Sequence, residues 1–275
     1  MRNLSQDDFA FLARLLNRRS GLMLTRDKEG MLERRVRPVL RRFGLKDHAQ
    51  LLRELRLGND SVAAALVEAV TVNDTWFFRD PEQFDSLSRL LPSLMAARAE
   101  EKRLRLWSAG CASGQEAYSL AMLLDEMGLA ADGWTIDLVA TDLSGEAIAR
   151  AEAGHYGGFE VQRGLSPDRL ARYFRPEAGR FLIVPGLRRM VQFRRFNLLD
   201  SFGWLDGLDL VLCRNVLLYF DPVTRQDILL RLAEAMAPHG LLLLGESEAV
   251  EAANFRAQAG RILAKAGIPA LRQSA

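Results

Sequence analysis

The sequence predicts an α/β protein in which a small helical domain precedes a parallel sheet covered by helices. Two observations support this fold class. From about residue 103 onward, short apolar runs alternate with helical stretches, which is the pattern of parallel strands buried on both faces. In residues 5–70 the apolar side chains recur at helical spacing, which predicts short helices. A length of 275 residues suits one large domain or two unequal ones.

Helices are predicted throughout residues 5–70. Ser5 is placed to cap the first helix, because two aspartates follow it in the first turn. The second helix contains Pro38, which is expected to kink it, and ends before Gly44. The second and later helices of this part are predicted over 28–43, 47–57 and 60–70.

The predicted sheet follows a helix over 81–99, which has Pro81 in its first turn. Strands are predicted over 104–110, 135–142, 190–197, 208–215 and 240–247, and helices over 115–127, 144–153 and 222–236. Between about 155 and 190 this alternation breaks. We expect a small antiparallel excursion there, with Pro185-Gly186 as its turn.

Composition argues against several classes of protein. Hydrophobic residues make up 49% and charged residues 26%, as in a soluble globular protein. No apolar run approaches the roughly 20 residues of a membrane helix, and a signal peptide is not expected. Cys111 and Cys213 are expected to be small buried hydrophobes, which fits a reducing cytoplasm. His48, His155 and His239 lie far apart, so no metal site is predicted.

Small residues join the first strand to its helix, over Gly110–Gly114. Glycines at such a turn let the backbone approach a ligand, and the helix N-terminus favours an anion. The loop lacks the full G-x-G-x-x-G pattern, so a nicotinamide cofactor is not favoured. A tight turn without a ligand explains this loop equally well.

A carboxylate ends the second strand. Asp142 follows Gly110 by 142 − 110 = 32 residues, whereas dinucleotide folds use about 20. The long first helix and the 128–134 loop account for the difference. A carboxylate in this place can accept two ribose hydroxyls. The alternative is a helix N-cap, a role that Ser144 also fits.

Polar residues also follow the next two strands, namely Asn197, beside Leu198, and the pair Arg214 and Asn215. Ligands of open α/β sheets bind outside the carboxyl ends of the strands, so this convergence predicts a binding site. An asparagine can read an adenine edge. For Arg214, a structural charge that holds the strand's exit is nearly as good an interpretation as ligand contact.

The segment TVNDTWFFRD, residues 71–80, joins the helices to the sheet. Its aromatic residues are expected to be core residues that fill the junction between the two domains, as a plug. Asn73, Thr75 and Arg79 are not needed for a plug, which makes them candidates for a ligand cleft at the junction.

Together these motifs resemble the CheR family of chemotaxis receptor glutamate methyltransferases, from about residue 5 to about 250. The specific pieces are TVNDTWFFRD, LWSAGCASGQEAYSLAM, ATDLS, FNLL, DLVLCRNVLLYFD and GESE. The resemblance implies a Rossmann-like sheet that binds S-adenosylmethionine (SAM). It implies an N-terminal all-helical domain over 1–80, a linker helix over 81–102 and a methyltransferase domain over 103–275. A small β-subdomain is implied as an insertion near 157–190.

The resemblance also assigns the site. It implies that SAM, and its product S-adenosylhomocysteine, contact Asn73, Thr75, Arg79, Glu116, Asp142, Asn197, Leu198, Arg214 and Asn215. Tyr219 matches a tyrosine near the transferred methyl, and Arg79 and Tyr219 are expected to shape the acceptor side. The implied acceptor is a glutamate on the cytoplasmic helical bundle of a chemoreceptor. A glutamate carboxylate is ionised at neutral pH, with a pKa of about 4.3, so no general base is needed.

Residues 1–56 hold 14 Lys and Arg against 7 Asp and Glu, which indicates an acidic partner. The resemblance assigns the basic helix, with Arg34, Arg35, Arg37, Arg41 and Arg42, to the receptor-facing surface. A solvated helix face is the alternative, and nucleic acid is disfavoured because no aromatic residues accompany the arginines.

The chain also departs from the family pattern. Glu246 stands where the family often has histidine, and Gln115 stands where an acid is common. The stretch 173–187 is shorter than in members that dock a receptor's C-terminal pentapeptide, which argues against tethering through that peptide. Two other functions remain open, namely a SAM-binding signalling adaptor with little catalysis and a SAM methyltransferase that acts on another acceptor.

Overall fold

The computed structural model describes residues 4–248 and 254–266. The chain forms two compact units, which we call the helical unit (1–72 with 219–224) and the sheet unit (73–218 with 225–275). Residues 73–80, which the sequence analysis grouped with the helices, cluster with the sheet unit. Phe77 and Phe78 explain this grouping, because both side chains are buried in the hydrophobic core of that unit.

The helical unit has the predicted helices α1 (Gln6–Ser20), α2 (Glu29–Arg42), α3 (His48–Arg56) and α4 (Asp60–Val70). A short 3-10 helix, η1 (Arg26–Lys28), was not predicted and precedes α2. The Ser5 side chain accepts a hydrogen bond from the Asp8 N–H at 3.1 Å, so the predicted cap is confirmed. Pro38 lies inside α2. The core of this unit includes a fully buried leucine from each α-helix, namely Leu12, Leu32, Leu51 and Leu66.

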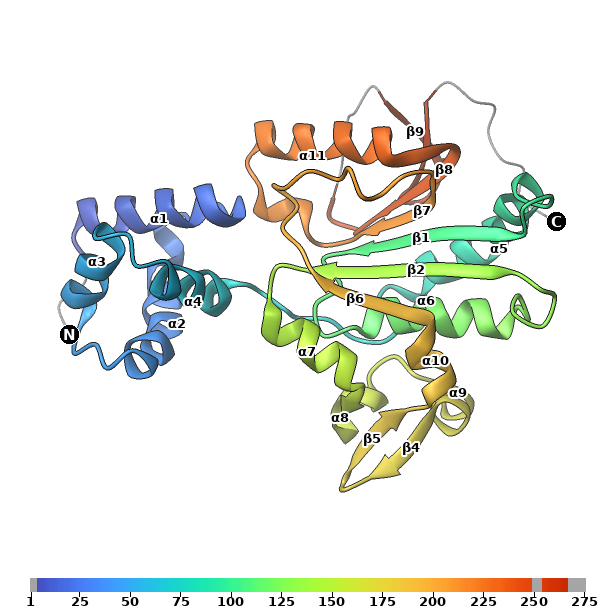
Figure 1. Cartoon of the computed structure of the whole chain (residues 1–275), viewed down its shortest axis with the longest axis horizontal. Coiled ribbons are helices and arrows are strands. Elements are labelled where there is room, and N and C mark those ends of the chain that lie inside the picture. The colour runs from blue at the N-terminus through green and yellow to red at the C-terminus, as the bar shows by residue number, and fades with distance from the viewer. Residues whose placement is uncertain (1–3, 249–253, 267–275) are drawn as a thin grey trace. The chain divides into compact units, whose positions relative to one another are not determined.

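The sheet unit confirms the predicted α/β class. Its main elements are α5 (Pro81–Ala97), β1 (Arg103–Ala109), α6 (Gln115–Glu126), β2 (Thr135–Asp142), α7 (Gly145–Ala153), β6 (Val191–Arg195), β7 (Leu208–Cys213), α11 (Pro222–Ala235), β8 (Met236–Leu244), β9 (Phe255–Ala259) and β10 (Ile262–Lys265). Within the described residues the strand order is β6-β2-β1-β7-β8-β10-β9 (Figure 1). Strands β6, β2, β1, β7 and β8 are parallel, and β10 and β9 are antiparallel to their neighbours.

The strand order reverses between β1 and β7. From β1 the sheet grows through β2 to β6 on one side, and through β7 to β8 on the other. In open α/β sheets this switch point is where ligands bind, at the carboxyl ends of the strands. The topology therefore places the exits of β1 and β7 at the expected binding edge.

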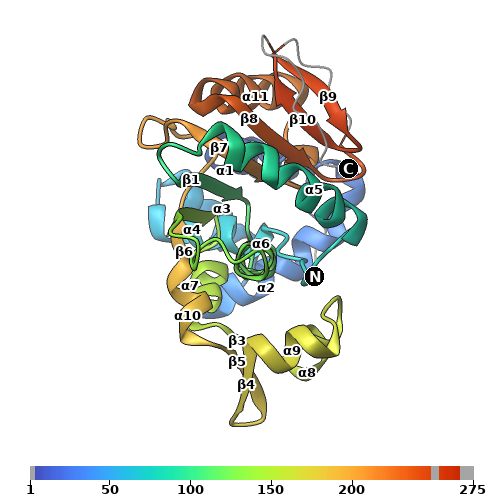
Figure 2. The same cartoon turned by 90° about the vertical axis from the view of Figure 1, so that its right-hand side faces the viewer.

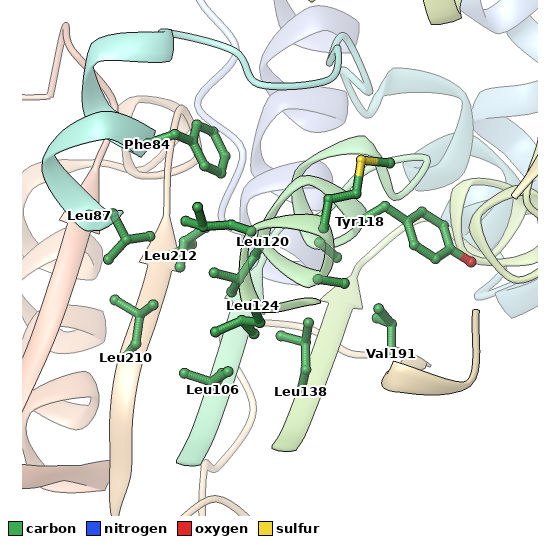
Figure 3. Packing of buried hydrophobic residues seen from close by; sticks show 14 of the residues in the cluster. Phe84, Leu87, Leu106, Tyr118, Leu120, Leu124, Leu138, Val191, Leu210 and Leu212 are labelled. Atoms are coloured by element: carbon green, nitrogen blue, oxygen red, sulfur yellow. The ribbon is translucent and has the colours of Figure 1, made fainter. Parts of the chain in front are cut away.

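Alternate residues of the central strands face opposite sides of the sheet. On one face, Leu106 of β1 and Leu210 of β7 join a hydrophobic cluster with α5 and α6 (Figure 3). On the other face, Trp107 is fully buried and packs edge-on against Phe202, with ring centroids 5.1 Å apart. Burial on both faces explains why the strands are continuous apolar runs.

The expected antiparallel excursion is present as an insertion beyond the β6 edge of the main sheet (Figure 2). It consists of β3 (His155–Tyr156), α8 (Gly158–Gln162), α9 (Pro167–Tyr173), β4 (Phe174–Glu177), β5 (Arg180–Ile183) and α10 (Pro185–Met190). The predicted turn at Pro185-Gly186 is wrong, because Pro185 opens α10, where a missing N–H costs nothing. The hairpin turn is Ala178-Gly179, which has the two positive φ angles, 48° and 75°, that a tight hairpin requires.

No helix in the part of the chain that the structure describes is both long enough and apolar enough to cross a membrane.

Candidate functional site

The loop after β1 is held by close backbone packing. A Cβ atom at Gly110, where φ is 82°, would lie 2.4 Å from Cγ2 of Val216. The N–H groups of Gly110 and Cys111 donate to the carbonyl of Thr141, at 2.8 and 2.9 Å. Glycine at position 110 is therefore explained by packing between the exits of β1 and β7, and the loop is joined to the end of β2. Cys111 itself is buried, as predicted, and burial raises the pKa of its thiol well above the ordinary value.

Asp142 lies at the end of β2 and is 9% exposed. One of its carboxylate oxygens accepts a hydrogen bond from the Ala112 N–H at 2.9 Å, and the other accepts from the Ser144 N–H at 2.8 Å. Ser144 is the N-cap of α7, because its hydroxyl accepts from the Ala147 N–H. The cap alternative for Asp142 is thus excluded, and its carboxylate joins the end of β2 to the loop after β1.

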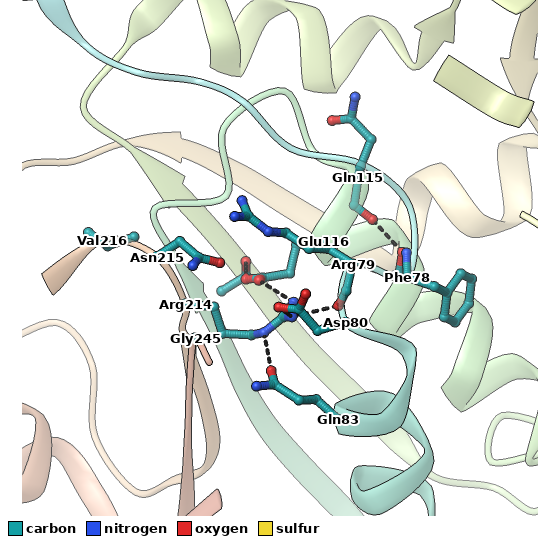
Figure 4. Close-up of polar contacts among 12 residues, drawn as sticks. Phe78, Arg79, Asp80, Gln83, Gln115, Glu116, Arg214, Asn215, Val216 and Gly245 are labelled. Carbon is teal, nitrogen blue, oxygen red and sulfur yellow. Dashed lines mark hydrogen bonds and ion pairs between the residues drawn. The ribbon is translucent and has the colours of Figure 1, made fainter. Parts of the chain in front are cut away.

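Arg214 follows β7 and is only 4% exposed. Its Nε donates to Oε1 of Gln83 at 2.7 Å, and its Nη1 donates to Oε2 of Glu116 at 3.1 Å. Its Nη2 donates to the Arg79 carbonyl and to Oδ2 of Asp80, the latter at 2.9 Å (Figure 4). Arg214 thus joins three segments, namely the β7 exit, the first turn of α6 and the residues that lead into α5. Its guanidinium is engaged by protein acceptors, which favours the structural interpretation of this side chain.

Glu116 is the buried counter-charge of Arg214. Its other carboxylate oxygen accepts from the Ser108 hydroxyl at 2.8 Å. Burial raises the pKa of the Glu116 carboxyl, and the Arg214 charge and the Ser108 hydroxyl oppose that rise. The predicted cofactor residues Arg79, Glu116 and Arg214 therefore lie in one cluster of direct contacts.

Asn215 has left-handed backbone, with φ of 60°. Its Oδ1 is buried and has no hydrogen-bond partner among the described residues. Such an atom is rare in folded proteins, and at a strand exit it is suited to accept an N–H or O–H of a ligand.

Glu248 holds this exit in place. Its buried carboxylate accepts hydrogen bonds from the N–H groups of Asn215, Val216 and Gly245 at 2.8 to 2.9 Å, and from Leu218 at 3.3 Å. Glu248 ends the GESE run, and nothing in that sequence pattern indicated a role for it. Because three of these four partners lie 30 to 33 residues away along the chain, no local pattern could have identified them.

The aromatic residues before α5 are core only in part. Phe77 and Phe78 are buried, as expected, whereas Trp76 is partly exposed, so the prediction that it belongs to the core is wrong. Arg79 is partly exposed, its Nη1 donates to the Asp74 carbonyl at 3.2 Å, and its guanidinium carbon lies 4.4 Å from the centroid of the Trp76 ring. Its Nε is buried and has no hydrogen-bond partner in the described structure. Asn73 and Thr75 are also partly exposed.

Asn197 and Leu198 follow β6, beside the exit of β2. Oδ1 of Asn197 accepts from the Leu199 N–H at 3.1 Å, and Leu198 is buried, with its carbonyl accepting from Nη2 of Arg231 at 2.8 Å. Both residues therefore shape the loop beyond the strand.

The remaining predicted residues belong to the helical unit. Tyr219 clusters there, and its carbonyl accepts from the Met23 N–H at 2.8 Å. In α2, Arg34, Arg37, Arg41 and Arg42 are exposed. Arg35 is instead half-buried and donates to the carbonyls of Ala69 and Thr71 at the end of α4. The roles of these residues at the acceptor stay predictions.

The donors and acceptors of the sheet unit fit SAM. Asp142 can accept the ribose hydroxyls, and Oδ1 of Asn215 can accept from the ammonium group of the methionine part. Nε of Arg79 is a cationic donor without a partner in the described structure, which suits it to a carboxylate of the cofactor or of the acceptor.

Comparison with known proteins gives two family matches that together cover most of the chain. Residues 73–262 match the CheR methyltransferase SAM-binding domain, and residues 7–71 match the CheR methyltransferase all-alpha domain. The chain is 40% identical over 250 residues to chemotaxis protein methyltransferase 1 of Pseudomonas aeruginosa, covering 88% of this chain and 90% of the relative. It is 37% identical over 249 residues to chemotaxis protein methyltransferase Cher2 of Pseudomonas putida, with the same coverages. It is also 37% identical over 246 residues to the probable biofilm formation methyltransferase WspC of Pseudomonas aeruginosa, covering 86% of this chain and 56% of that protein.

Proposed function

The chain belongs to the CheR methyltransferase family, and we propose that it transfers the methyl group of SAM to glutamate side chains of chemoreceptors. The relatives named chemotaxis protein methyltransferase support this proposal, because the chain spans 90% of the length of each of the two compared. One structural observation supports it most directly. The buried polar residues at the exits of β1, β2 and β7 converge at the switch point of the sheet, where a nucleoside-bearing ligand is expected.

The chemistry asks little of the protein beyond binding and alignment. SAM supplies an electrophilic methyl group on its sulfonium sulfur. The acceptor carboxylate is already ionised at neutral pH, so no proton has to be removed to make the nucleophile. The S–CH₃ bond breaks as the O–CH₃ bond forms, which gives a glutamate methyl ester and S-adenosylhomocysteine. The tasks left to the chain are to hold donor and acceptor in line and to keep water out.

The residues of the sheet unit divide these tasks. We assign Asp142 and Asn215 to the cofactor, with Asn73, Thr75, Asn197 and Leu198 completing its surroundings. Arg214 and Glu116 position the exits that carry these groups, because their own side chains are paired with each other. Arg79 is assigned to the acceptor side, since its guanidinium is only partly engaged. The family resemblance adds Tyr219 near the transferred methyl.

The basic helix α2 is assigned to the receptor. Four of its arginines, Arg34, Arg37, Arg41 and Arg42, are exposed and available to an acidic helical bundle. Arg35 contributes less in this proposal, because its side chain is hydrogen-bonded to the end of α4.

The experiment that tests this function supplies the protein with methyl-labelled SAM and with membranes that contain chemoreceptors. Label is expected on the receptor as a methyl ester that mild base releases. Membranes without chemoreceptors serve as the control. Label that survives mild base would contradict glutamate methylation, and SAM binding without any transfer would favour a signalling adaptor.

A role in biofilm formation is a second candidate, because the chain is similar to the probable biofilm formation methyltransferase WspC. The same assay with receptors that control chemotaxis and with receptors that control biofilm formation separates the two, because only the cognate receptors should gain the ester.

A further inference from the structure

Two arginines of the sheet unit share one indole ring. The guanidinium carbon of Arg163 lies 3.6 Å from the centroid of Trp76, and that of Arg79 lies 4.4 Å from the same centroid. Arg163 belongs to the insertion, in the turn between α8 and α9, whereas Trp76 and Arg79 precede α5. Residues about 90 positions apart thus form one cationic cluster, which we call the Trp76 cluster (Asp74, Trp76, Arg79 and Arg163).

The position of Arg163 is set by its backbone. The next residue, Gly164, has φ of 90°, and a Cβ atom there would lie 1.8 Å from the carbonyl oxygen of Phe77. Only glycine permits so close an approach. The turn of the insertion is therefore pressed against the segment that carries Trp76 and Arg79, and this contact presents Arg163 at the ring.

The charges of the Trp76 cluster do not balance. The acidic partner that the described structure gives Arg163 is Asp74, at 3.9 Å, and the Asp74 side chain is 68% exposed. An exposed pair of this length contributes little stability. Arg79 donates to the carbonyl of Asp74 and forms no ion pair in the described structure. Two guanidinium groups therefore face a single solvated carboxylate.

Two other arginines of the insertion are engaged differently. Arg169 makes a two-point contact with Glu126, at 2.8 and 2.9 Å, and Arg172 pairs with Asp125 at 2.6 Å. Those two arginines join the insertion to α6. The Arg163 side chain is 42% exposed, and its ion pair in the described structure is the long contact with Asp74, so its charge is accessible to a ligand.

We propose that Arg163 is a specificity residue that binds an acidic side chain next to the target glutamate, with Arg79 beside it on Trp76. The ligand class is a carboxylate-bearing peptide segment. A guanidinium pairs strongly with a carboxylate, and the Trp76 ring holds the guanidinium groups of Arg163 and Arg79 at one place. This inference rests on the proposed function, which places Arg79 on the acceptor side.

The test compares Arg163→Ala and Arg163→Lys with Arg189→Ala, which removes an exposed arginine from α10 of the same unit. Methyl transfer to chemoreceptor membranes is measured at varied receptor and varied SAM concentrations, and calorimetry gives the SAM Kd. Arg163→Ala is expected to raise the receptor KM about tenfold, the effect of one lost charge-assisted hydrogen bond. We expect kcat and the SAM Kd to stay within about twofold of wild type, because the cofactor groups are untouched. Arg163→Lys should recover part of the loss, and Arg189→Ala should match wild type.

Three results would overturn the proposal. A receptor KM unchanged by Arg163→Ala would show that the side chain does not bind the acceptor. A SAM Kd weakened as much as the receptor KM would assign Arg163 to the cofactor or to the fold. Wild-type protein that forms no ester with any receptor would remove the proposed function as well, whereas active wild type with an insensitive variant removes this inference alone.

Discussion

Two regions of the sheet unit are centred on arginines that differ in how they are buried and paired. Around Arg214 every described contact is internal, since the side chain is buried and donates to two carboxylates, an amide and a carbonyl. In the Trp76 cluster, Arg79 and Arg163 stack on a partly exposed ring, and one exposed carboxylate lies near them.

The difference shows that burial and pairing separate arginines that position a site from arginines that bind a ligand. A buried charge that is fully paired positions its surroundings and strongly destabilises the fold if a partner is removed. An exposed guanidinium with little pairing is available to a ligand and contributes little to stability. Substitutions in the two regions should therefore separate into stability effects and substrate effects.

The largest effect is expected for Arg214→Met. Removal of the guanidinium leaves Glu116 buried without its counter-charge, which should cost about 3–5 kcal/mol of unfolding free energy. SAM binding should fall as well, because three segments of the site lose their common anchor. Urea unfolding followed by circular dichroism measures the first quantity, and calorimetry measures the second.

The double variant Arg214→Met with Glu116→Gln is the control, since it removes both charges and should recover part of the stability. A single variant of wild-type stability that has lost SAM binding would show that Arg214 contacts the cofactor directly. That result would break the contrast between the two regions.

Asp142→Ala should have the next largest effect. The carboxylate is expected to accept two ribose hydroxyls, so its loss should weaken SAM about 100-fold, or about 2.7 kcal/mol. The readout is the rise in melting temperature that SAM produces, which should disappear at ligand concentrations that stabilise wild type. The melt without SAM is recorded separately, because the Ala112 and Ser144 N–H groups also lose a partner.

Asp137→Ala provides the matched control in the same strand. Asp137 pairs with Arg103 near the start of β2, away from the strand's exit, and an exposed pair of this kind contributes little. Its SAM-dependent rise should equal that of wild type. An undiminished rise in Asp142→Ala would remove Asp142 from the cofactor site.

The strands and their exits could be predicted from the sequence, because burial on both faces leaves continuous apolar runs that end in polar residues. The position of Asp142 and the cap at Ser5 followed from the same local signals. Local signals are also where prediction went wrong. Pro185-Gly186 is as suited to a helix start as to a turn, and only the positive φ angles of Ala178-Gly179 decide between them.

Other features could not be read from sequence, for two physical reasons. Strands β9 and β10 form an antiparallel edge with many half-buried residues, so they lack the apolar pattern of the central strands. Glu248 and Arg163 act on residues about 30 and 90 positions away, and such pairings are created by the fold. The sequence therefore located the strand exits of the site, while the partners that position them emerged from tertiary contacts.

The smallest effect is expected for Glu248→Gln, which keeps the size of the side chain and one acceptor oxygen. The amide nitrogen replaces an acceptor where backbone N–H groups converge, so unfolding free energy should fall by about 1–2 kcal/mol. SAM affinity should fall about fivefold, because the exit of β7 at Asn215 loses part of its anchor.

Glu246→Gln, an exposed change in the same turn, is the control and should alter neither the unfolding free energy nor the SAM affinity. Thermal melts with and without SAM measure both, and equal behaviour of the two variants would show that the β7 exit holds its shape without the Glu248 charge. Loss of stability with SAM affinity intact would instead assign Glu248 to the fold alone. The buried polar contacts of the sheet unit would then position fewer segments of the site than the contacts of Arg214 indicate.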